Sequence, residues 1–353
     1  WVTDDFSWRW IFLLNVPIGI GTFFAVLHLV EDPPWQKRGA KGIDYIGLGL
    51  IALGLGCLEV TLDRGEDAGW FGSPFIIAFA ILSAIGLLGA VAWLLSTRTP
   101  VVDLRVLGDR NFAVGSLMIF VMATILYSSA VVIPRFSQEQ LGYTAFLAGL
   151  LLSPGAVLLL FLIPIVNLSS KFVSPRLVVA IGFIMLGGGL YYSTGLVPEM
   201  DFDTLMLMRI SQSVGLAFLF VPISTMTYAT LPKALNTDAA ALFVMFRNIA
   251  GSVGISLASA AVVEGGQAHQ AHLVRHLTPL DRGYAWTANA IEQGLRAFPG
   301  SGQGVDGVVF GELRRQAAVL AFSDVFVVCA LVSFAMVPLV LLFRPGRATA
   351  KGG

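Results

Sequence analysis

Charged residues are scarce in this chain. Asp, Glu, Lys and Arg together make up 12% of its 353 residues, whereas soluble domains carry roughly 25%. Hydrophobic residues make up 56%, and the mean hydropathy is +0.80. A soluble protein with so few ionisable groups would leave much apolar surface in water, while a lipid-facing protein meets no such cost. The composition therefore predicts an integral membrane protein.

Other shortages exclude several classes of function. Cys57 and Cys329 are the only cysteines, and both lie in apolar runs, so a disulfide framework, a thiolate metal site and a redox pair are not expected. The formal net charge is zero, which provides no basic surface for nucleic acid. The sequence has no Walker-type phosphate loop and no catalytic Ser/His/Asp set on a soluble face. We expect no enzyme, no cofactor and no nucleic-acid partner.

Long apolar runs dominate what is present. A helix that crosses the hydrocarbon core needs about 20 mostly apolar residues, and nine windows of the sequence meet this requirement. So many uncharged runs do not fit within one soluble core, so the chain is predicted to be an all-α polytopic membrane protein. The predicted spans are residues 10–30, 45–62, 75–95, 113–134, 146–166, 177–197, 205–231, 239–263 and 320–343.

The loops between these spans alternate in positive charge. Twelve Lys and Arg residues lie in the odd-numbered loops and the C-terminal tail, against three in the N-terminal stub and the other short loops. Because positive charge in short loops marks the cytoplasmic side, we predict that the C-terminus is cytoplasmic and that Trp1 is external. The twelve are Lys37, Arg38, Lys41, Arg98, Arg105, Arg110, Lys171, Arg176, Lys233, Arg344, Arg347 and Lys351.

One long loop is predicted over 264–319, on the external side. His269, His272 and His276 lie there with a spacing that places them on one face of a helix. A metal site is one alternative, but no cysteine completes a ligand set and carboxylates are sparse nearby. We favour a solvated helical extension and expect no metal.

Five motifs, in order, carry a family resemblance. The stretch WRWIFLLNVPIGIG at 8–21 resembles the sixth span of drug:proton antiporters in the major facilitator superfamily, and LDRGEDAGWFGS at 62–73 resembles the signature of its fourteen-span branch. The stretches at 101–116, 140–157 and 246–256 match the following half in order and spacing. The whole is similar to multidrug exporters of the EmrB type. The residues that carry the first two motifs are Asn15, Pro17, Gly19, Asp63, Arg64, Gly65 and Trp70.

The resemblance implies a domain plan and a function. Residues 1–31 would be the last helix of the N-terminal bundle, 32–98 an inserted helix pair, and 99–353 the six-helix C-terminal bundle. The implied function is export of amphipathic drugs in exchange for protons across the bacterial inner membrane. The implied partners are membrane lipid, a periplasmic adaptor protein and an outer-membrane channel. Because the chain opens with Trp1 beside a membrane segment, we expect a fragment lacking five spans, and a non-transporting remnant or scaffold stays open as the alternative.

Two arginines lie within predicted spans, where ionisable side chains are costly and often functional. Arg247 is deep in its span beside Asn248, and we expect it to point into the bundle, either as a structural hydrogen-bonding clamp or in the transport pathway. Arg209 lies one turn from Gln212 near the external end of its span. For Arg209 we favour an anchor that reaches the headgroups, with a transport role as the alternative.

Two carboxylates also fall near span ends. We expect Glu59 to pair with Arg64, as a structural pair rather than a proton carrier. Asp324 lies near the predicted start of the ninth span and is expected to cap its first turn.

Small residues and prolines interrupt several spans. Gly251 and Gly254 permit close helix contact in lipid. Pro154, Gly155 and Pro222 weaken backbone hydrogen bonding and mark kinks or hinges, with plain packing as the simpler alternative for each.

Overall fold

The computed structural model describes residues 1–30, 44–97, 99–169, 172–232, 235–275, 284, 286, 289, 291–292 and 305–344. Every structural statement below concerns this part of the chain. Several residues used above lie outside it: Lys37, Arg38, Lys41, Arg98, Lys171, Lys233, His276, Arg347 and Lys351.

The described residues form helices joined by turns and short loops, without strands, and nine of the helices are long and apolar enough to cross a membrane. The predicted fold class and the nine predicted spans are therefore confirmed. The helices are α1 (Val2–Asp5), α2 (Arg9–Leu29), α3 (Tyr45–Arg64), α4 (Pro74–Ser96), α5 (Arg110–Leu141), α6 (Ala145–Ser169), α7 (Pro175–Tyr192), α8 (Phe202–Tyr228), α9 (Asn236–Val274) and α11 (Val305–Leu339), with short 3-10 turns η1 (Trp70–Gly72), η2 (Leu104–Gly108) and η4 (Val340–Leu342).

Helices α9 and α11 extend more than ten residues beyond one end of the spans predicted for them. α9 continues to Val274, so the helical extension predicted around His269 and His272 is confirmed for these two residues. α11 begins at Val305 rather than near 320, so the loop predicted over 264–319 is wrong at both ends. At 1.5 Å per residue, the 39 residues of α9 reach roughly 60 Å, about twice the hydrocarbon thickness. Because the membrane span is already helical, the extension does not need the costly nucleation step, and the helix can continue into water.

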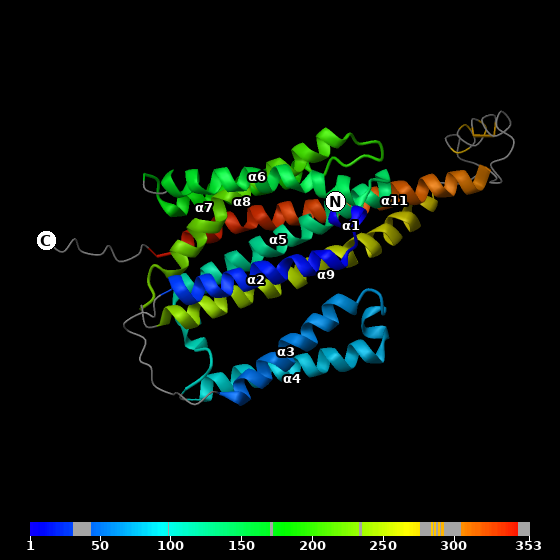
Figure 1. The fold of residues 1–353 in the computed structure, drawn as a ribbon. Coiled ribbons are helices and arrows are strands. Elements are labelled where there is room, and N and C mark those ends of the chain that lie inside the picture. The colour runs from blue at the N-terminus through cyan, green and yellow to red at the C-terminus, as the bar shows by residue number, and fades with distance from the viewer. Residues whose placement is uncertain are drawn as a thin grey trace.

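Helices α5, α6, α7, α8, α9 and α11 pack into one bundle (Figure 1). α5 lies at its centre and contacts α6, α8, α9 and α11. Phe136 of α5 and Phe322 of α11 are fully buried and pack edge-to-face, with ring centroids 5.4 Å apart. The core continues through side chains such as Met122, Phe183 and Leu216. This bundle is the frame that positions the polar residues described below.

Hydrogen bonds close one end of the bundle, which we call the Phe343 end. Asn111 at the start of α5 donates from Nδ2 to the carbonyl of Arg344 at 3.1 Å and accepts from its amide at 2.7 Å. Arg176 at the start of α7 donates to the carbonyl of Phe343 at 2.5 Å. The opposite end, where α5 ends and Gly142 adopts a positive φ of 70°, we call the Gly142 end.

Helices α3 and α4 form an antiparallel hairpin beside the bundle (Figure 1). Gly54 and Gly86 face each other where the two helices cross, and a Cβ on Gly86 would lie 2.6 Å from the Gly54 backbone. Ser83 donates to the carbonyl of Gly54 at 3.0 Å. Small residues that let backbones approach are a principal source of helix association in lipid, so this contact holds the hairpin together.

Asp44 fixes the Phe343-facing end of the hairpin. It caps α3 by accepting from the amide of Gly47 at 2.9 Å, and it accepts from Nε1 of Trp93 on α4 at 2.9 Å. The amide of Val101 is a third donor, at 3.4 Å. The pKa of Asp44 is held below its usual value, mainly by the hydrogen bond from the Gly47 amide and further by those from Trp93 and Val101. Desolvation of the carboxylate opposes this shift.

Helix α2 buries none of its residues, although it overlaps the bundle in the view of Figure 1. The short helix α1 before it contacts the bundle through Asp4, which accepts from the amide of Phe146 at 3.1 Å.

Candidate transport site

Arg209 lies inside the bundle, with only 8% of its surface exposed. Its Nη1 donates to Oγ of Ser129 on α5 at 2.9 Å and to Oε1 of Gln212, one turn along α8, at 3.3 Å. Gln212 in turn donates from Nε2 to Oγ of Ser193, just after α7, at 2.8 Å. These four side chains form a polar chain across three elements, which we call the Arg209 cluster.

The preference for Arg209 as an anchor at the membrane surface is wrong. The guanidinium turns inward because Ser129 and Gln212 supply acceptors within the bundle. Helix α6 closes over it at Gly155, where a Cβ would lie 3.4 Å from Cγ of Arg209 and would clash with Oγ of Ser213. Pro154, which has no backbone N–H to donate, directly precedes Gly155. The interruption in the backbone hydrogen bonds of α6 therefore lies where α6 contacts α8. Pro222 is buried about three-quarters of the way along α8.

The charge of Arg209 has no carboxylate partner within ion-pair distance in the described residues, and its Nε is buried without a hydrogen-bond partner. A cation in a low-dielectric bundle without a counter-ion is costly. Side chains of this kind inside membrane proteins usually serve a substrate or a proton pathway. The arrangement is suited to receiving an anionic group.

Arg247 on α9 is half-buried, and its Nε is buried with no partner in the described chain. Asn248 beside it is exposed. No hydrogen bond links Arg247 to Arg209 or Gln212 in the described residues. The structure therefore brings Arg209 and Gln212 together and leaves Arg247 apart, on another helix.

The approach of α9 to α5 depends on small residues. A Cβ on Gly254 would lie 2.5 Å from the carbonyl oxygen of Thr124, and one on Gly251 would lie 3.1 Å from the ring of Tyr127. Ser128 also donates to the carbonyl of Gly254 at 2.8 Å. Both glycines therefore lie where the two backbones come closest.

Glu59 does not pair with Arg64, contrary to the expectation. Its carboxylate accepts a 2.6 Å hydrogen bond from Ser252 of α9, while Arg64 lies 3.9 Å from Asp63. Glu59 and Arg64 are five residues apart on α3, which at 3.6 residues per turn separates their directions by roughly 140°. Glu59 therefore reaches α9, while the side chain of Arg64 stays exposed.

Asp324 does not cap a helix, because α11 begins 19 residues earlier, at Val305. Its Oδ2 lies 2.6 Å from Nε2 of His269 on α9. Both side chains are partly exposed, at 58% and 30%. The extension of α9 beyond its predicted span thus brings His269 beside Asp324, which lies within the predicted ninth span.

The sequence comparisons agree with this architecture. The model of the Major Facilitator Superfamily matches residues 1–255. The chain belongs to the major facilitator superfamily. It is 30% identical over 354 residues to the probable multidrug resistance protein EmrY of Escherichia coli, covering 100% of this chain and 68% of that protein. It is 28% identical to the multidrug export protein EmrB of the same organism, with the same coverage, and 28% identical to the fatty acid resistance protein FarB of Neisseria gonorrhoeae, covering 69% of it.

Within this superfamily member, the LDRGEDAGWFGS signature forms a tight turn. The amide of Trp70 donates to the carbonyl of Gly65 at 2.6 Å. Gly69 and Trp70 both have positive φ, of 73° and 52°, a conformation that glycine adopts freely and tryptophan rarely. A Cβ on Gly65 would lie 2.7 Å from the Trp70 ring, so that position has no room for a side chain.

The other signature residues lie on the exposed helix α2. Asn15 donates from Nδ2 to the carbonyl of Ile11 at 3.1 Å, Pro17 lies within the helix, and Gly19 has open space around it.

Ser129 and Ser193 are cluster members that the sequence did not single out. Ser129 lies within an apolar run beside Ser128, and a serine pair in such a run is the signal that was available. Ser193 lies near the end of the predicted span 177–197 and showed no distinctive pattern.

Proposed function

We propose that this superfamily member exports amphipathic drugs or other toxic compounds from the cell in exchange for protons. The observation that carries the proposal is the similarity to bacterial drug-export proteins along the whole chain. Similarity of this extent favours an exporter over a membrane scaffold. The apolar, all-helical described structure supports transport rather than catalysis.

The domain plan belongs to the same proposal. Residues 1–31, which contain α2, are the last helix of an N-terminal bundle, and 32–98, which contain the hairpin, are the inserted pair. Residues 99–353 form the C-terminal bundle. Superfamily transport by rocking of one half against the other requires halves that move as units, and the packed core shared by α5 to α11 supports such a unit.

The proposed orientation puts the Phe343 end in the cytoplasm and the Gly142 end outside the inner membrane. The asymmetry of Lys and Arg among the short loops supports it. An adaptor protein in the periplasm and an outer-membrane channel are then the proposed partners on the Gly142 side.

The Arg209 cluster and Arg247 are the proposed transport-pathway residues, together with Asn248. A buried guanidinium without a carboxylate provides a fixed positive charge that stabilises an anionic group or an ionised acid when either one approaches. When that acid takes up a proton it loses its charge and is released from the guanidinium, which would couple proton movement to drug movement. Gly251, Gly254, Pro154, Gly155 and Pro222 are proposed to permit the helix contacts and bends that this requires.

Dye accumulation in cells tests the proposal. The full-length gene product is expressed in bacteria that lack their own exporters, and ethidium uptake is measured with and without a protonophore. We expect lower ethidium accumulation than in cells with an empty vector, and loss of the difference when the proton gradient is collapsed. Equal accumulation at confirmed membrane abundance would contradict export, and a difference that survives the protonophore would contradict proton coupling.

A further inference from the structure

Two adjoining cavities lie where the hairpin ends at the Gly142 end. The larger one, of about 720 Å³, is lined by Glu59, Asp63 and Asp67 on one side and by Phe75 and Phe79 on the other. The smaller one, of about 310 Å³, shares the same three carboxylates and extends between α3, α5 and α9. Both volumes are of the size that takes up small organic ligands.

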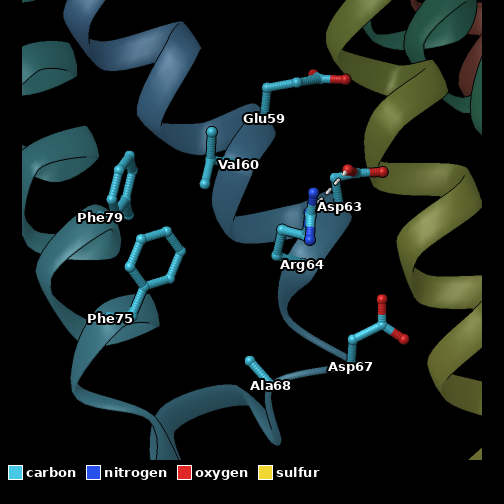
Figure 2. Close-up of a pocket in the computed structure, with 8 residues that line it drawn as sticks. All are labelled: Glu59, Val60, Asp63, Arg64, Asp67, Ala68, Phe75 and Phe79. Carbon is cyan, nitrogen blue, oxygen red and sulfur yellow. Dashed lines mark ion pairs between the residues drawn. The ribbon is translucent and has the colours of Figure 1, made fainter.

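The carboxylates and the aromatic rings occupy different sides of the larger cavity. In Figure 2, Glu59, Asp63 and Asp67 project from the α3 side toward α9, whereas Phe75 and Phe79 lie on α4. The two rings pack together with centroids 4.5 Å apart, and Phe75 is 52% exposed. Because all five residues line the larger cavity, a ligand there lies between an apolar aromatic wall and a row of acidic residues.

The negative charge of this region is only partly compensated. Arg64 also lines the larger cavity, where it lies 3.9 Å from Asp63. Both side chains are more than two-thirds exposed, a geometry in which an ion pair contributes little. Arg135, the cation that lines the smaller cavity, already pairs with Glu139 at 2.7 Å. Glu59 and Asp67 have no ion-pair partner among the described residues.

Ser256 gives an independent indication of a ligand. It lines the smaller cavity, is only 6% exposed, and its Oγ has no hydrogen-bond partner in the described structure. A buried hydroxyl without a partner is costly, so a polar group within this cavity would relieve it.

A compact metal ion is not the ligand that this geometry favours. Among the described residues, no three His, Cys, Asp or Glu side chains converge on one point, as a metal ion requires. Glu59 and Asp63 instead lie about one turn apart on α3, and Asp67 lies just after the helix ends, a spread that suits a large cation with dispersed charge. An aromatic face attracts such a cation as well.

We propose that the Gly142 end of the hairpin binds lipophilic organic cations, with Glu59, Asp63 and Asp67 supplying the charge and Phe75 and Phe79 the apolar contact. This site is distinct from the Arg209 cluster, which carries the opposite charge. Under the proposed orientation it opens outside the inner membrane. That placement rests on the proposed function, whereas the binding itself does not.

Equilibrium binding to the purified full-length protein in neutral-lipid nanodiscs tests this site without any gradient, so a protein that fails to export still reports on it. The probe is tetraphenylphosphonium, with tetraphenylborate as an anion of the same shape. We expect saturable binding of the cation alone. Asp63→Asn and Glu59→Gln should each raise the Kd for the cation at least tenfold. Phe79→Leu should raise it several-fold, because leucine keeps much of the apolar volume but lacks the aromatic ring.

Glu199→Gln is the matched control, because it removes one exposed carboxylate from the loop between α7 and α8 at the same end; its Kd should stay within twofold of the wild type. The site assignment is overturned by an unchanged Kd in both Asp63→Asn and Glu59→Gln. Equal binding of tetraphenylborate would overturn the charge argument, and displacement of the probe by millimolar Mg²⁺ would identify a divalent-cation site instead.

Discussion

Nη1 of Arg209 donates a hydrogen bond of 2.9 Å to Oγ of Ser129 and so joins α8 to α5 inside the bundle. Ser129 is 3% exposed and Arg209 is 8% exposed, so water does not compete for this bond. In a core that is mostly apolar, such a contact fixes which faces of the two helices meet. It also leaves the guanidinium dependent on neutral acceptors.

Ser129→Ala should destabilise the bundle, because it leaves Nη1 with Gln212 alone. Loss of one partner from a buried donor costs about 1–3 kcal/mol, which thermal unfolding of the purified protein in detergent measures. Ser153→Ala is the control: that exposed serine on α6 bonds only to its own helix, through the carbonyl of Leu150. Equal unfolding midpoints for the two variants would show that the Arg209 bond contributes nothing.

Arg247→Ala should lower export more than it lowers membrane abundance. The reason is the half-buried guanidinium with an unpartnered Nε, which is costly to keep unless it acts on a substrate or an acid. Dye efflux at matched protein level measures the effect. Lys should restore export in part if charge suffices, and poorly if the planar fork is needed. Arg105→Ala, at an exposed arginine of η2, serves as the control, and wild-type efflux in the Arg247 variant would remove this residue from the mechanism.

Gly254→Ala should destabilise the contact between α5 and α9. Its Cβ would lie 2.5 Å from the backbone oxygen of Thr124, which cannot yield as a flexible side chain does, and overpacking of this kind costs about 1–3 kcal/mol. Gly149→Ala on α6 meets nothing within 4 Å and should be neutral or slightly stabilising, since alanine favours helix. Similar unfolding midpoints for the two variants would mean that α9 shifts freely.

Cysteine labelling in intact cells should separate the two ends of the bundle. Gly72 and Gly108 both have open space for a Cβ, and the native Cys57 and Cys329 are buried, so they give little background. A membrane-impermeant maleimide should label Gly72→Cys, at the Gly142 end, and should label Gly108→Cys only after lysis. Labelling of both positions in intact cells, or of Gly108→Cys alone, would contradict the proposed orientation.

Cation binding at the hairpin should strengthen as pH rises. Burial raises the pKa of Glu66 above its usual 4.5; Asp67, Glu139 and Glu264 add to the rise, and Arg135 opposes it. A proton on Glu66 removes negative charge from the smaller cavity, so tetraphenylphosphonium affinity should increase from pH 4.5 upward through the raised pKa and then level off. Binding isotherms across this range measure it, and Glu66→Gln should flatten the profile. An affinity that falls with rising pH would contradict the assignment.

The sequence by itself determined the class of the protein, because hydropathy is a local property and a span of about 20 apolar residues has few alternatives in lipid. Its nine windows match nine helices in the described chain, and its motifs identified the family. Helix ends were less certain: nothing in the local pattern of 305–319 showed that α11 begins there, since a helix that leaves the membrane needs no apolar face.

The tertiary structure alone decided which polar residues meet. Depth along a span suggested that Arg209 reaches the membrane surface, yet the neighbouring helices bring Ser129 and Gly155 against it inside the bundle. Glu59 meets Ser252, which is 193 residues away, and His269 meets Asp324 across 55 residues. The rotational orientation of each helix depends on its contacts with several other helices, and no single segment of the sequence specifies all of these contacts.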